Sequence, residues 1–403
     1  MWFCGIDWAT DHHDALTIDE QGRPVGSIRV PHTPEGLSQL DASLEAISGP
    51  DHEHLACIVE TKHGLLIAHL LEQGWPVSPV NPRTVERRRA PSGAKTDTID
   101  AYLLAKTGRA DFADLRRLNP DSELVQELKT LTRDQDALIQ MQTRLVNQLT
   151  ACLKAYYPVA LELFGKLHQP STLAFLRAYP TLQAARAATA EELAHLLKQA
   201  RYPGAKRAAQ RMVEQLQQPS LQANEVTTRT QSRLMLALLD QLEPLFKQIA
   251  ADDKAIERLF LRHADRELFQ ALPGAGKRLA PRLLAEIGDD RTRSAAASSL
   301  QALAGTSPVL FQSGTYCKAH RRLGCIKPLR NVLQQFAWQS ARWEPWARDY
   351  YQRKRVEGKS HTVAVRALAN VWVRILFAIW LKGEPYQSAI FEQARCQHAP
   401  RAA

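Results

Sequence analysis

The first part of the chain alternates short apolar runs with helical patterns. Residues 2–9 form a largely apolar run, and two further runs are joined by a turn that contains Gly and Pro. The apolar run LACIVE at 55–60 is continuous, which indicates a strand buried on both faces. Strand and helix patterns then alternate, which predicts an α/β domain with a mixed sheet. The predicted strands span 2–9, 14–19, 25–30, 55–60 and about 76–80, and the predicted helices span about 34–47, 63–73 and 96–108.

From residue 121 the spacing of apolar positions becomes that of long helices. One apolar stripe recurs at steps of three and four residues until Pro158, with Gln135 and Gln142 in its gaps. Residues 159–222 are broken by prolines into short helices, and a second long stripe follows. This order predicts an antiparallel pair of long helices of the coiled-coil kind, with inserted helices between them. The first stripe is Leu124, Leu128, Leu131, Leu138, Leu145, Leu149 and Cys152, and the second is Leu234, Leu238, Leu242, Leu245, Ile249, Ile256 and Leu259.

The last third begins with LPGAGKRLAPRLLAEIGD at 272–289 and continues through a Ser/Gly/Pro loop into mixed aromatic and basic helical sequence. It predicts a third, mostly helical domain. We therefore expect three domains, which span 1–114, 115–265 and 266–403.

Composition narrows the class of protein. The 403 residues are 45% hydrophobic and 23% charged, which is ordinary for a globular protein and excludes disordered, collagen-like and disulfide-scaffold chains. The six cysteines form neither a CxxC pair nor a Cys/His zinc spacing, as suits a reducing cytoplasm. The first residues carry acids where a signal peptide needs basic and apolar residues. The apolar stretch VWVRILFAIWL is too short to span a bilayer and contains Arg374, so we expect no membrane role.

Charge is distributed unevenly along the chain. Residues 1–114 hold 10 basic and 17 acidic side chains, residues 115–265 hold 20 and 16, and residues 266–403 hold 22 and 9. These blocks carry net charges of −7, +4 and +13, which sum to the formal charge of +10. A basic last third can neutralise nucleic-acid phosphates, and an acidic first third can hold metal ions. Basic proteins that bind no nucleic acid are also common.

Four carboxylates in the first third form a candidate metal site. Asp7 lies in the first predicted strand, Glu60 ends the buried strand, and Asp97 and Asp100 lie three apart on a helix, where side chains share a face. An Asp in an apolar strand is costly unless it is paired or bound to metal. Oxygen ligands suit Mg²⁺, and paired ions can assist phosphoryl transfer. Taken singly, each acid is more often structural or exposed. Their combined order resembles a ribonuclease-H-like layout.

Two motifs in the last third suggest contact with nucleic acid. LPGAGKRLA resembles the hairpin of a helix-hairpin-helix motif, in which Gly274 and Gly276 admit a phosphate to backbone amides and Lys277 and Arg278 add charge. An ordinary helical corner remains the alternative, and the motif is no Walker loop. The segment LAGTSPVLFQSGTY places Ser313 on an exposed turn, where a serine is usually structural.

Basic residues follow this serine without any acid. They interleave with aromatic residues further on, a pattern that suits phosphate contacts and base stacking but is also found on packed helices. The candidate nucleic-acid contacts in this stretch are Lys318, Arg321, Arg322, Lys327 and Arg330.

Together these motifs resemble the DEDD transposases of the IS110/IS1111 insertion-sequence family, which are bridge-RNA-guided recombinases. The matching motifs are GID, VET, KTDTIDAYLLA, LPGAGKRLA and LAGTSPVLFQSGT, in the family's order. The resemblance implies a RuvC-like N-terminal domain, a coiled-coil middle and a C-terminal transposase domain whose catalytic serine matches Ser313 rather than Ser307.

The resemblance also implies a reaction and partners. DNA strand exchange would pass through a covalent phosphoserine, with Mg²⁺ held by the four acids. A structured guide RNA would pair with donor and target DNA, and dimers or tetramers would form the active assembly in the bacterial cytoplasm, at the nucleoid during the reaction. Two departures, the longer turn from Glu60 to Gly64 in ETKHG and GTSP before Ser313, concern the subgroup and the local loops.

Three other functions fit parts of the pattern. An RuvC-like nuclease or resolvase would use the same acids with water as nucleophile and would not need Ser313. A sugar-kinase-like or actin-like ATPase shares the core sheet, but it needs a second glycine-rich phosphate loop, which residues 1–114 do not contain. A non-catalytic protein that bridges DNA would need only the long helices and the basic surface.

Overall fold

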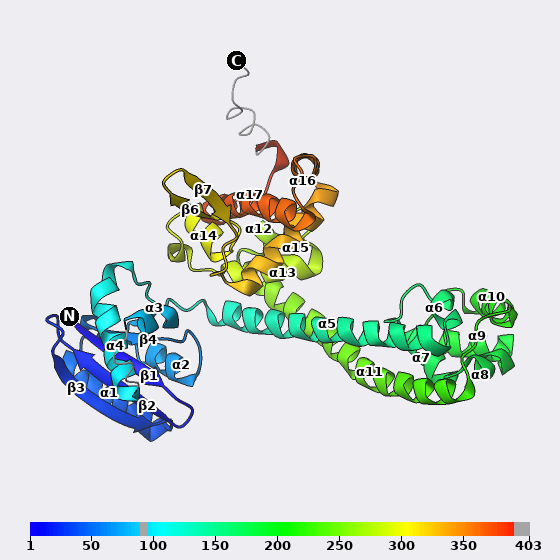
Figure 1. The fold of residues 1–403 in the computed structure, drawn as a ribbon, viewed down its shortest axis with the longest axis horizontal. Coiled ribbons are helices and arrows are strands. Elements are labelled where there is room, and N and C mark those ends of the chain that lie inside the picture. Colours follow the sequence, from blue (N-terminus) through cyan, green and yellow to red (C-terminus); the bar gives the residue numbers. More distant parts are fainter. Residues whose placement is uncertain (89–95, 391–403) are drawn as a thin grey trace, which may run out of the picture. The chain divides into compact units, whose positions relative to one another are not determined.

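The computed structural model describes residues 1–88 and 96–390. Lys95 and Cys396, which belong to the motifs and cysteines considered above, lie outside these residues. The chain divides into two compact units, residues 1–120 and residues 121–403 (Figure 1). The three-domain division with boundaries at 114 and 265 stays a prediction.

A five-stranded mixed sheet forms the centre of the first unit (Figure 1). The strands follow the spatial order β3-β2-β1-β4-β5, with β1 antiparallel to β2 and parallel to β4. The mixed sheet predicted from the apolar runs is confirmed, and it is consistent with a RuvC-like domain. The strands are β1 Trp2–Trp8, β2 His12–Ile18, β3 Pro24–Pro31, β4 Leu55–Val59 and β5 Val77–Pro79.

Helices cover both faces of this sheet. On one face, Cys4 and Ile6 of β1 share a core with Leu40 of α1 and Leu70 of α2. On the other face, Phe3 packs against α4, whose side chain Leu104 is buried in the same core. The strand β4 is buried along its whole length between these layers, as its unbroken apolar sequence predicts. The helical elements of this unit are α1 Pro34–Ser48, η1 His52–His54, α2 Leu65–Glu72, α3 Pro82–Arg87, α4 Asp97–Asp111 and η2 Phe112–Asp114.

Two long helices dominate the second unit. Helix α5 spans Glu123–Tyr156 and helix α11 spans Glu225–Arg262. They run antiparallel, because Gln135 bonds to the Ile249 carbonyl while Cys152, further along α5, bonds to the earlier Gln231 carbonyl. The predicted helical pair is therefore confirmed, and its supercoiling stays a prediction.

One position of the second stripe was predicted wrongly. Leu234 is 47% exposed, and its neighbour Met235 is buried in its place. The stripe drifts here because the helix meets the inserted helices as well as α5, and Met235 packs in their shared core. These inserted helices are α6 Val159–Leu163, α7 Pro170–Ala178, α8 Leu182–Ala187, α9 Ala190–Gln199 and α10 Ala205–Gln217.

A separate hydrophobic core packs the C-terminal helices against the start of α5 and the end of α11. Val125 of α5 and Leu259 of α11 are buried with Leu284 and Trp372 in this core. The last long helix, α17, is long and apolar enough to cross a membrane by length and composition. Its side chains Leu368, Trp372 and Leu376 are buried in the core, which accounts for that composition.

The C-terminal part also contains a β-hairpin that the sequence analysis treated as a loop. Strands β6 Val309–Ser313 and β7 Tyr316–His320 pair antiparallel (Figure 1). The helical elements around it are α12 Arg266–Gln270, α13 Gly276–Ile287, η3 Arg291–Arg293, α14 Ala297–Leu303, α15 Lys327–Trp343, α16 Pro345–Val356 and α17 His361–Lys382.

Candidate catalytic and nucleic-acid-binding site

Asp7 lies near the end of β1 on the face of the sheet that α4 covers. Successive side chains of a strand alternate between faces, so Asp7 shares its face with Gly5. A Cβ built on Gly5 would stand 2.8 Å from Leu104 Cβ and closer still to the Ala101 carbonyl oxygen. The absent side chain therefore lets α4 lie directly against β1. This close approach brings the start of α4 to Asp7.

Asp97 and Asp100 occupy the first turn of α4. Thr96 caps the helix by accepting a hydrogen bond from the Ile99 backbone N–H, at 3.2 Å. Acidic side chains in a first turn are favoured by the helix dipole. Local sequence thus accounts for where the helix starts, and the start of the helix places both carboxylates beside the sheet.

Glu60 directly follows β4, which ends at Val59, and is half-buried. Because β4 runs parallel to β1, the ends of both strands lie at the same edge of the sheet. Burial, the largest cause, and the charges of Asp100, Glu60 and Asp97 together raise the pKa of Asp7 to about 6. All four acids singled out in the sequence are therefore close enough to interact electrostatically.

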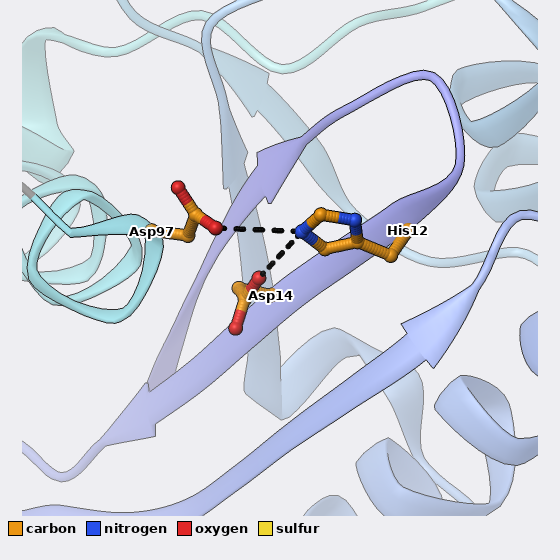
Figure 2. Close-up of side chains that lie close together, drawn as sticks. All are labelled: His12, Asp14 and Asp97. Atoms are coloured by element: carbon orange, nitrogen blue, oxygen red, sulfur yellow. Dashed lines mark hydrogen bonds and ion pairs between the residues drawn. The ribbon is translucent and has the colours of Figure 1, made fainter.

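A second group of residues at this site was missed in the sequence. His12 and Asp14 of β2 and Asp97 of α4 place ligand atoms within 4.8 Å of one another (Figure 2). His12 Nε2 lies 3.4 Å from Asp97 Oδ2 and 3.6 Å from Asp14 Oδ2. In the register of the sheet Asp14 stands opposite Asp7. The predicted strand began at residue 14, two residues after the start of β2, so His12 was not placed on it.

Arg29 of β3 partly compensates these charges. Its Nε lies 3.0 and 3.1 Å from the two carboxylate oxygens of Asp14, and its Nη2 lies 3.0 Å from Asp97 Oδ2. Asp14 is almost buried, so this pair satisfies a carboxylate that would otherwise be costly to desolvate. The signal that could have found Arg29 is its place opposite Asp14 on the neighbouring strand.

The donor set is compatible with a divalent metal ion. Carboxylates and one imidazole converge from β1, β2, the segment after β4 and α4, and their mutual repulsion is what a divalent cation would relieve.

Ser313 is the last residue of β6 and directly precedes the two-residue turn of Gly314 and Thr315. Gly314 has φ +57°, a conformation that suits glycine in a tight hairpin turn. The hairpin is exposed from Leu310 to His320. The expected exposure is confirmed, whereas the expected loop is a strand end held in register opposite Tyr316.

The glycine-rich motif forms a turn between α12 and α13. Gly274 has φ +78°, and a Cβ there would stand 2.6 Å from Trp343 Cδ1, so the turn lies against α15. Gly276 has φ +57° and open space around it. Lys277 lies 3.0 Å from Glu257, and Arg278 lies 2.8 Å from Asp253, both on α11. Both cations therefore form ion pairs with acidic side chains of α11 and would have to leave these partners to bind a phosphate.

The other candidate contacts gather around the hairpin and the start of α15. Lys318, Arg321 and Lys327 are exposed, whereas Arg322 and Arg330 are partly buried. Burial, with a contribution from the charge of Arg321, lowers the pKa of Arg366 on α17 below its usual range. Like charges are thus crowded on this surface, a condition that bound phosphate would relieve.

Comparison with known proteins agrees with this geometry. Residues 4–158 match a family model described as transposase, and residues 266–352 match one described as the transposase IS116/IS110/IS902 family. The two matches span the β1 and α4 acids and the Ser313 hairpin respectively.

Relatives match along nearly the whole chain. A mini-circle protein for IS117 of Streptomyces coelicolor is 34% identical over 381 residues, which is 91% of each chain. An insertion element IS110 protein of Streptomyces coelicolor is 29% identical across 96% of this chain and 95% of its own. An insertion element IS900 protein of Mycobacterium paratuberculosis is 28% identical across 94% and 95%. This chain therefore belongs to the IS116/IS110/IS902 family of transposases, enzymes that recombine DNA.

Proposed function

We propose that this transposase exchanges strands between the ends of its insertion sequence and a target DNA through a covalent phosphoserine at Ser313, directed by a structured guide RNA. The observation that carries the proposal is the convergence of Asp100, Glu60 and Asp97 on Asp7, together with a serine exposed at the tip of a hairpin. The family membership supplies the reaction class, and the family resemblance supplies the guide RNA and the dimeric or tetrameric assembly.

The acidic cluster fits Mg²⁺. All of its carboxylates offer hard oxygen donors, and burial together with the charges of Asp100, Glu60 and Asp97 raises the pKa of Asp7, which a bound cation would reverse. Asp7, Glu60, Asp97 and Asp100 would hold the ion. When bound, it would stabilise the negative charge that develops on the phosphate.

Ser313, the proposed nucleophile, is exposed to solvent at the end of β6, where a DNA strand can reach it. In the proposed step the Ser313 oxygen bonds to phosphorus, the bond from phosphorus to one deoxyribose oxygen breaks, and that oxygen takes up a proton. The hydroxyl of the exchanged strand then displaces Ser313, which recovers a proton. Each step replaces one phosphoester with another, so no nucleotide hydrolysis is required to drive it.

The C-terminal surface would hold the nucleic acid. Exposed Lys318, Arg321 and Lys327 would bind phosphates directly. Lys277 and Arg278 would first have to exchange their acidic partners for phosphate. Because exposed ion pairs contribute little stability, of order 0–1 kcal/mol, that exchange costs little.

A strand-exchange assay tests the proposal. The full chain, copurified with RNA transcribed from its own element, is incubated with donor and target plasmids and Mg²⁺. We expect joined products from the parent and from Ser307→Ala, a control in the same segment, and none from Ser313→Ala or Asp100→Asn. Omission of the RNA should also abolish joining.

The same assay addresses hydrolysis by water. Nicked or linear DNA without joined products from the parent, at an unchanged rate in Ser313→Ala, would establish a nuclease and contradict the proposal. Joined products in the absence of RNA would contradict the guide but leave the phosphoserine intact.

A further inference from the structure

The β6–β7 hairpin has two faces of different chemistry. The pairs Ser313–Tyr316, Phe311–Lys318 and Val309–His320 stand directly opposite each other. Side chains alternate between faces along each strand, so these six residues share the face of Ser313. Phe311 and His320 confirm this, because their rings meet edge to face at 4.8 Å. Leu310 and Cys317 belong to the other face.

The Ser313 face presents aromatic rings to solvent beside the serine. Phe311 is 56% exposed and Tyr316 is 54% exposed. Tyr316 is the cross-strand partner of Ser313, at a spacing of about 4.5–5.5 Å between Cβ atoms, and Lys318 is its diagonal neighbour, which a long side chain can reach. Two rings and one ammonium group therefore lie on the same face of the hairpin as the Ser313 hydroxyl.

The hairpin is anchored at its base. Thr306 donates a hydrogen bond to the Asn370 side chain at 2.9 Å, and the Ile326 backbone N–H donates to the Leu303 carbonyl at 2.8 Å. Gly305, at φ +63°, leaves no room for a Cβ beside Cys325. Rings that project from an anchored hairpin lose little freedom when they bind, which favours a specific contact.

The basic residues around the hairpin indicate which kind of partner binds this face. No Asp or Glu occurs between Asp290 and Glu344, whereas β7 and the residues that follow it as far as Arg330 carry five Lys or Arg residues. A partner that combines negative charge with flat apolar surfaces fits such a face, and an unpaired nucleic-acid strand has both. A second copy of the hairpin would instead bring like charges together.

We propose that Phe311 and Tyr316 stack on unpaired bases of the DNA next to the phosphate that Ser313 attacks, while Lys318 contacts the backbone. The inference rests on the proposed function and assigns two positioning residues to it. The rings would hold the bases of an opened duplex and so fix the phosphate at the serine hydroxyl.

Photocrosslinking tests the stacking without the chemistry. The full chain with Ser313→Ala is mixed with single-stranded DNA that contains 5-iododeoxyuridine, irradiated, and mapped by mass spectrometry. We expect crosslinks at Phe311 and Tyr316 and none at Leu310 or Cys317 on the opposite face. Crosslinks confined to other segments, or present equally on both faces, would overturn the proposal.

Matched variants give a second readout. In the same background, Phe311→Ala with Tyr316→Ala should weaken binding of this DNA by at least about tenfold at fixed salt, because each stacked base contributes about 1–3 kcal/mol. Leu310 is 66% exposed on the opposite face, so Leu310→Ala should leave binding unchanged, and Tyr316→Phe should retain it. Equal losses from Leu310→Ala would overturn the proposal.

A measurement of the oligomeric state tests whether a second copy of the chain covers this face instead of DNA. If the double alanine variant changes the molar mass measured by light scattering without nucleic acid, the face packs against another copy and the proposal fails. Because all binding is measured with Ser313→Ala, crosslinks at the rings would stand even if another residue proved to be the nucleophile. Failure of this inference is thus separate from failure of the proposed function.

Discussion

Gly5 of β1 lies so close to Ala101 of α4 that no side chain fits between the strand and the helix. Gly108, further along α4, is similarly close to Ile58 of β4, where a Cβ would stand 2.6 Å from Cδ1. Two glycines, one on the sheet and one on the helix, thus set the distance between them. That distance decides whether Asp97 and Asp100 can reach Asp7.

Replacement of Gly5 by Ala should therefore disturb the acidic cluster without touching any of its members. The added Cβ must push α4 outward, at a cost of about 1–3 kcal/mol in the free energy of unfolding. We expect weaker Mg²⁺ binding by calorimetry and a strong loss of strand exchange. Gly26→Ala on β3, whose Cβ would meet only the flexible end of Ile47 at 2.9 Å, is the control. Unchanged Mg²⁺ affinity in Gly5→Ala would contradict this account.

The raised pKa of Asp7 predicts a pH dependence of stability. A carboxyl whose pKa rises from 3.8 to about 6 on folding favours the folded state below pH 3.8, and this contribution is lost as the pH rises through about 6. Above that pH the ionised cluster repels itself in metal-free protein. Asp7→Asn should therefore stabilise the first unit at pH 7 by about 1 kcal/mol, after allowance for solvent screening, and have no such effect near pH 4.

Hydrogen exchange of peptides that cover β1 and β2, with and without EDTA, measures this effect. Mg²⁺ should slow exchange in the parent and do so far less in Asp7→Asn. If Asp7→Asn accelerates exchange equally at pH 4 and pH 7, the pKa of Asp7 is not raised on folding.

Arg29 offers a separate test of the same electrostatics. Arg29→Ala removes the partner of nearly buried Asp14 and one partner of Asp97, so the metal-free protein should lose stability, measured as a lower thermal midpoint. Mg²⁺ should recover more of the thermal midpoint in this variant than in the parent, because the ion takes over the missing compensation. Arg29→Lys should fall between the two. A midpoint that Mg²⁺ raises equally in all three proteins would show that Arg29 does not interact with the metal site.

The basic surface predicts a salt dependence of binding. Neutralisation of Arg321, Arg322 and Lys327 should weaken binding of non-specific duplex DNA, and each lost phosphate contact should reduce the slope of log affinity against log salt by about 0.9. Arg366→Gln should reinforce the loss, because Arg321 lies close enough to depress its pKa. A triple variant with unchanged affinity and unchanged slope would show that the DNA binds elsewhere. Arg177→Gln serves as the control, because Arg177 is paired with Asp240 among the helices of the second unit.

Much of the fold could be predicted because its signals are local. The unbroken apolar run of β4, the Thr96 cap and the leucine stripes of α5 and α11 each specify their own element. The four acids were found because their order along the chain matches strand, strand end and helix start.

The rest depends on pairing between distant segments. His12, Asp14 and Arg29 reach the site only through the register of β2 with its neighbours, which no local pattern specifies. The β6–β7 hairpin was read as a loop because its exposed strands lack apolar and polar alternation. Leu234 was misplaced because the drift of the α11 stripe is set by packing against the inserted helices.

The most direct test of the account is the identity of the residue that joins to DNA. The assembled complex with its RNA is incubated with donor and target DNA and Mg²⁺, quenched in denaturant and digested, and the nucleotide-bearing peptide is sequenced by mass spectrometry. We predict a phosphodiester on Ser313, absent from Ser313→Ala and from Asp100→Asn. An adduct on Ser307 or Tyr316, or full strand exchange by Ser313→Ala, would contradict the account.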